Sequence, residues 1–131
     1  MAKILLTEDD EAVRTFVARA LTMDGHTIVS AEDGEEGFDR LQEHNGEFDL
    51  LLSDIKMPFM DGIELARNAA GLYPELKILF MTGFADQRER ADGLDSIVID
   101  VVSKPFTLNQ IRDSVRVALQ HQPMEDFREA V

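Results

Sequence analysis

Five short runs of Ile, Leu and Val, separated by longer polar segments, constrain the fold of this 131-residue chain more than any other feature. Most of these runs lack the alternation of apolar and polar residues that a half-exposed strand shows. Continuous apolar runs of this length are typical of strands buried on both faces, as in a parallel sheet covered by helices. We therefore expect strands at residues 4–6, 27–31, 48–52, 76–81 and 97–102.

The segments between the runs carry apolar residues at the spacing of one helical face. We expect helices over residues 13–21, 35–43, 63–73, 85–93 and 108–118. The last begins with Thr107 and Gln110 in capping-box spacing, whereas residues 85–93 are mostly charged and form the weakest predicted helix. Strands that alternate with helices predict an α/β fold, a doubly wound three-layer sandwich around a parallel five-stranded sheet.

Composition excludes several classes of function. The formal net charge of −13 repels phosphate backbones and anionic lipids, so we expect no direct contact with nucleic acid or membrane. No apolar run approaches the ~18 residues of a membrane span, and we expect a cytoplasmic location. The chain has no cysteine, which excludes a disulfide framework and thiol chemistry.

Polar side chains follow four of the five predicted strands. They are Glu8, Asp9 and Asp10 after the first, Asp54 after the third, Thr82 after the fourth and Lys104 after the fifth. Because the carboxyl ends of parallel strands meet at one edge, we expect these residues to lie together, with Asp10 as a helix cap. Clustered carboxylates repel one another, and a set of oxygen ligands favours Mg²⁺.

The loop after the first strand, TEDDEAV, argues against a dinucleotide or flavin site. Such sites place glycines or hydroxyls there, so that backbone N–H groups can hold a phosphate at the helix end. The carboxylates of this loop would repel a phosphate unless a metal ion lay between them. A phosphoryl group that arrives at a metal-charged site is therefore favoured over a bound nucleotide.

Four stretches, ILLTEDD, LLLSDIKMPFMDG, MTGF and SKPFT, resemble the receiver domains of two-component response regulators, stand-alone CheY-like regulators among them. The resemblance covers roughly residues 3–120 and implies a flavodoxin-like sheet with strand order 2-1-3-4-5. It implies a receiver domain at residues 1–120 and a C-terminal tail at residues 121–131. A narrower resemblance links ILLTEDD, MDGIELAR and MTGF to CpdR-like regulators but fails across residues 85–101.

The resemblance implies a phosphoacceptor and a Mg²⁺ site. Asp54 would be the nucleophile that takes a phosphoryl group from a sensor histidine kinase or a histidine phosphotransferase. Asp9 would bind Mg²⁺ directly, and Glu8 would act through water. Lys56 would offer the metal its backbone carbonyl. Such a protein is not an enzyme beyond self-catalysed phosphotransfer and dephosphorylation.

The same resemblance assigns two residues to the phosphoryl group. Lys104 would contribute its ammonium, and Thr82 its hydroxyl, to the phosphoryl oxygens. The bond before Pro105 is expected to be cis, which directs Lys104 inward. Pro58 and Gly62 are expected to shape a rigid loop after Asp54.

The output surface is harder to predict. The resemblance implies a downstream protein bound through the fourth helix, the fifth strand and the fifth helix. Receivers commonly carry an aromatic residue two or three positions before the lysine, where this chain has Val101. Phe84 is a candidate source of bulk near the site, and as a hypothesis it would flank the site with Lys56 and slow hydrolysis of the acyl phosphate.

Two other functions remain as alternatives. A Mg²⁺-dependent aspartyl phosphohydrolase needs a second aspartate two residues after its nucleophile, where this chain has Lys56. A receiver-like binding module that works without phosphorylation is favoured only by Val101. Taken singly, Asp54 reads as a turn residue, Thr82 as a strand-ending residue and Lys104 as a solvated charge. Their joint presence favours the phosphoacceptor.

Overall fold

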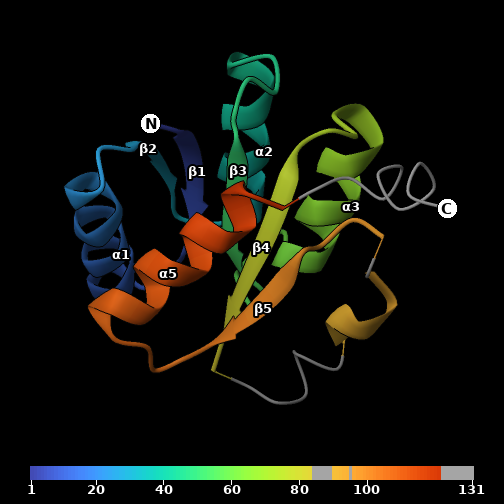
Figure 1. The fold of residues 1–131 in the computed structure, drawn as a ribbon. Helices are drawn as coiled ribbons and strands as arrows, with labels where there is room; N and C mark the ends of the chain where they lie inside the picture. The colour runs from blue at the N-terminus through green and yellow to red at the C-terminus, as the bar shows by residue number, and fades with distance from the viewer. Residues whose placement is uncertain (84–89, 95, 122–131) are drawn as a thin grey trace, which may run out of the picture.

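Five parallel strands form one sheet in the order β2-β1-β3-β4-β5, which confirms the predicted topology (Figure 1). The computed structural model describes residues 1–83, 90–94 and 96–121. The strands are β1 (Lys3–Thr7), β2 (Thr27–Ala31), β3 (Leu50–Asp54), β4 (Lys77–Thr82) and β5 (Asp100–Ser103). No helix among these residues is long and apolar enough to cross a membrane.

Helices cover both faces of the sheet, α1 and α5 on one side and α2 and α3 on the other (Figure 1). They are α1 (Glu11–Met23), α2 (Gly34–Glu43), α3 (Gly62–Leu72) and α5 (Leu108–Leu119). Successive strand residues point to opposite faces, so Leu51 packs with α3 while Leu50 and Leu52 pack with α1 and α5. Burial on both faces explains why the apolar runs show no alternation.

Local sequence accounts for where the helices begin. Asp10 caps α1 by accepting hydrogen bonds from the amides of Ala12 (2.9 Å) and Val13 (3.2 Å), as predicted. Thr107 and Gln110 form the predicted capping box at the start of α5. Because helix N-termini lie beside the carboxyl ends of the strands, each cap also fixes one border of the edge where the acidic residues gather.

The predicted boundaries were wrong by two residues at both ends of β3 and by three residues at the start of β5. Phe48 is buried but precedes β3, and β5 begins three residues later than expected. Val98 instead bonds through its amide to the carbonyl of Leu94, which closes a turn. Of the weakest predicted helix, residues 85–89 lie outside the described residues, and Ala91–Leu94 at its end form a 3₁₀ helix, η1.

Candidate functional site

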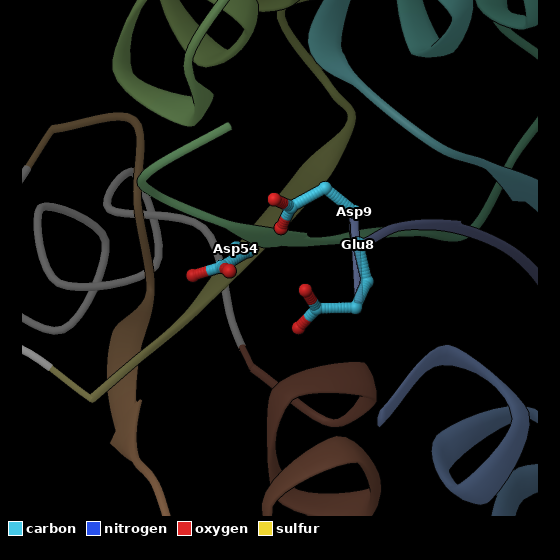
Figure 2. Close-up of side chains that lie close together, drawn as sticks. All are labelled: Glu8, Asp9 and Asp54. Atoms are coloured by element: carbon cyan, nitrogen blue, oxygen red, sulfur yellow. The ribbon is translucent and has the colours of Figure 1, made fainter. Parts of the chain in front are cut away.

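Three carboxylates converge at the carboxyl edge of the sheet. Glu8 and Asp9 follow β1, and Asp54 ends β3, the neighbouring strand. The strands pair in a register that places Thr7 beside Ser53, so Glu8 and Asp54 come next to each other one residue later. One oxygen from each of the three carboxylates lies within 4.8 Å of the others, and Figure 2 shows the three groups around a common space.

Lys104 joins two of these carboxylates. It follows β5, and its backbone amide donates to the carbonyl of Thr82 (2.9 Å) while its peptide bond to Pro105 is cis, as predicted. Its Nζ lies 2.6 Å from Oε1 of Glu8 and 3.1 Å from Oδ2 of Asp54. One ammonium thus bridges the carboxyl ends of the first and third strands from a position beyond the fifth.

The charges of the cluster perturb one another. Burial raises the pKa of Glu8 from 4.5 to about 7. Hydrogen bonds from Lys104 and from the amide of Asp10 lower this pKa, and the negative charge of Asp54 raises it further. Burial lowers the pKa of Lys104, but the hydrogen bond to Glu8 and the charge of Asp54 outweigh it and leave that pKa raised. Three carboxylates with one ammonium leave excess negative charge that a cation would relieve.

The predicted site residues line one cleft, with one exception. The lining is Glu8, Asp9, Asp10, Asp54, Lys56, Met57, Pro58 and Lys104. Asp54 is 7% exposed, whereas the side chain of Lys56 is exposed at the rim. Thr82 ends β4 and is buried beside the cleft without lining it. Phe84 lies outside the described residues, and Val101 is half-buried against the core.

The loop between β3 and α3 is fixed by backbone contacts. The amide of Gly62 donates to the carbonyl of Ile55 (2.7 Å), and the amide of Gly34 in α2 donates to that of Met60 (3.0 Å). A Cβ at Gly62 would lie 2.2 Å from the carbonyl oxygen of Asp54, and one at Gly34 would lie 2.1 Å from that of Met60. Only glycine allows these approaches, so both positions hold the loop beside the nucleophile.

Sequence reasoning missed several residues that support the cluster. Arg14 donates from Nη1 to the carbonyl of Glu8 (2.8 Å). Helical side chains lean toward the helix start, so an arginine in the first turn of α1 could have been expected to reach this loop. Thr7 donates to the Ser53 hydroxyl (2.5 Å), which donates to the carbonyl of Asp54 (2.8 Å). The sequence signal for this pair is that a hydroxyl residue directly precedes each acidic residue, Thr7 before Glu8 and Ser53 before Asp54.

Comparison with known proteins identifies the family of this chain. A family model described as the response regulator receiver domain matches residues 4–116. The response regulator receiver protein CpdR of Brucella abortus (strain 2308) is 43% identical over 119 residues, which cover 91% of this chain and 98% of CpdR. The sensor kinase CckA of the same strain is 35% identical over 92% of this chain, which spans only 13% of that kinase.

Among solved structures, the response regulator TrrA of Thermotoga maritima, in complex with Mg²⁺ and BeF, superposes with a TM-score of 0.78. It is 27% identical, and the alignment covers 90% of this chain and 99% of TrrA. The likeness in fold thus extends over 90% of this chain.

Proposed function

Because the chain belongs to the response regulator receiver domain family, we propose that Asp54 accepts a phosphoryl group from the phosphohistidine of another protein. The donor would be a sensor histidine kinase or a histidine phosphotransferase. The contact of Lys104 with both Glu8 and Asp54 carries this proposal, since it brings a nucleophile, an acidic pair and a cation into one cleft.

The donor atoms of the cleft fit Mg²⁺. The ligands are oxygens, and three carboxylates supply them within 4.8 Å of one another. Glu8, Asp9, Asp54 and the backbone carbonyl of Lys56 would hold the ion. When bound, Mg²⁺ supplies positive charge that offsets the repulsion between the carboxylates and the incoming phosphoryl oxygens.

The chain's own residues would carry out the transfer. An oxygen of Asp54 attacks phosphorus, the P–N bond of the phosphohistidine breaks, and the released imidazole takes up a proton from solvent. Lys104, already 3.1 Å from Asp54, stabilises the charge on the transferred group, and Thr82 offers its hydroxyl. Water would reverse the modification by hydrolysing the acyl phosphate, and we propose no turnover beyond these two steps.

The output of the switch would be a change in a protein-binding surface. We place that surface on β5, α5 and the segment between β4 and β5, in a cytoplasmic protein. Val101 lies in this region, half-buried in β5 beside Phe80 of β4. A smaller residue at a position that is commonly aromatic predicts that the change is carried by shifts of backbone rather than by rotation of a ring.

Amide NMR spectra with Mg²⁺ and beryllofluoride test the phosphoacceptor. We expect shifts around the cleft in the wild type and none from beryllofluoride in Asp54→Asn. Asp113→Asn is the matched control, because it removes one negative charge from the exposed side of α5 and should respond like the wild type. A folded wild type that binds Mg²⁺ but ignores beryllofluoride would refute the proposal and favour a module that works without phosphorylation.

A further inference from the structure

Phe59 has a backbone conformation that bulky residues rarely adopt. Its φ is +67°, and the amide of Met60 donates to the carbonyl of Pro58 (2.8 Å) across it. Phe59 is therefore the central residue of a three-residue turn with positive φ, a rare and strained form. Glycine would adopt it at lower cost. The backbone alone thus disfavours phenylalanine at this position.

Packing does not explain the phenylalanine either. Its side chain is 84% exposed, so the ring adds little buried apolar area to the fold. The loop around it is held through the backbone of Met60 and Gly62, which fixes the backbone that carries the ring. An exposed ring on a strained backbone contributes little to the stability of the free molecule, which favours a role in contact with a partner.

The position of Phe59 identifies that partner. Lys56, Met57 and Pro58, directly before it, line the cleft that contains Asp54. Asp54 is 7% exposed, and a donor phosphorus must come within ~3.5 Å of its carboxylate for transfer. A protein that delivers its phosphohistidine to this depth has to press against the rim of the cleft. A small acyl phosphate reaches Asp54 without doing so.

We infer that Phe59 is a specificity-determining residue for the protein phosphodonor, and that its ring packs against apolar residues beside the donor's phosphohistidine. This inference rests on the proposed phosphoacceptor function. An aromatic side chain has few rotatable bonds, so it gives a large apolar contact at little cost in conformational entropy. The ring selects protein donors, whereas Asp54 and Lys104 perform the chemistry on any donor.

The test compares a protein donor with acetyl phosphate. The histidine kinases and phosphotransferases of the source organism are purified, labelled with radioactive phosphate, and the one that transfers fastest to the wild-type chain is used. We expect Phe59→Gly to lower kcat/KM with this protein by about 10- to 100-fold, the loss expected for one buried ring. Labelling by acetyl phosphate should stay within about twofold of the wild type.

Two further variants separate docking from folding. Phe59→Tyr keeps the ring and should retain most of the transfer rate. Leu72→Ala removes another exposed apolar side chain, at the far end of α3, and should transfer like the wild type. Glycine adopts a positive φ readily, so Phe59→Gly should keep the fold, and a lower transfer rate can be assigned to the lost ring.

Three outcomes would overturn the inference. They are an unchanged transfer rate in Phe59→Gly, an equal loss with both donors, and a wild type that acetyl phosphate labels but no protein donor does. The last would leave the phosphoacceptor standing. A wild type that no donor labels would instead refute the proposed function, so the two failures are distinguishable.

Discussion

Replacing Glu8 by glutamine is expected to stabilise the metal-free protein at pH 8 and to change its stability much less at pH 5. Glu8 is buried, and its pKa is raised from 4.5 to about 7 in the folded protein. The folded state therefore binds this proton more tightly than the unfolded state does. The stability due to protonated Glu8 is complete below pH 4.5 and is lost as the pH rises through 7.

The size of the effect follows from the same two pKa values. Each tenfold change in proton affinity is worth ~1.4 kcal/mol, so the step from 4.5 to about 7 corresponds to about 3 kcal/mol. Roughly 2 to 3 kcal/mol of this should develop between pH 5 and pH 8. Glutamine resembles the protonated glutamate in size and hydrogen bonding, so the variant does not lose stability through ionisation at this position as the pH rises.

Urea unfolding in EDTA at pH 5, 6, 7 and 8 measures the prediction. Glu75→Gln is the control, because Glu75 is exposed in the loop before β4 and its replacement changes the net charge equally. Its difference from the wild type should hardly depend on pH. Added Mg²⁺ should stabilise the wild type more than Glu8→Gln, since the ion favours ionised Glu8. A glutamine variant that gains nothing over the wild type between pH 5 and pH 8 would refute the reasoning.

Three further predictions concern the nucleophile loop, the bridging lysine and a helix cap. Gly62→Ala should lower the free energy of unfolding by about 1 to 3 kcal/mol in urea titrations, because its Cβ would meet the carbonyl of Asp54. Gly71→Ala, whose Cβ would lie in open space, should raise that free energy by about 0.5 to 1 kcal/mol. Equal effects of the two substitutions would contradict the clash. Lys104→Met should slow labelling by acetyl phosphate about 100-fold, as seen when one transition-state donor is lost, and a wild-type rate would exclude that role. Thr107→Ala should cost about 1 kcal/mol of stability in thermal or urea unfolding without altering labelling, and a change in labelling would show that the cap also affects the site.

The sheet could be predicted from the sequence because strands that are buried on both faces consist of continuous runs of apolar residues. Strand ends could not, because an apolar residue serves the core equally well inside or just outside a strand. Phe48 precedes β3, and Val98 closes a turn before β5, yet both are buried. The hydrophobic pattern records burial, whereas the strand boundary depends on which backbone amides find partners in the neighbouring strand.

The acidic cluster could likewise be predicted, because topology alone brings the carboxyl ends of parallel strands together. Glu8, Asp54 and Lys104 meet at that edge in the structure. The position of Thr82 outside the cleft lining depends on side-chain packing that the pattern does not contain. The positive φ of Phe59 was hidden for a different reason: it follows from how the loop is tied to α2 and α3, and phenylalanine gives no local signal for it.

The bridge between Lys104 and Glu8 spans 96 residues of sequence and links the end of β1 to the end of β5, the first and last strands of this sheet in chain order. Until Lys104 has been synthesised, Glu8 lacks the ammonium group that offsets its burial beside Asp54. A nascent chain that stops before β5 would therefore carry an acidic cluster that resists closing. We therefore expect completion of the sheet and assembly of the cleft to be coupled, since both require β5 and the lysine that follows it.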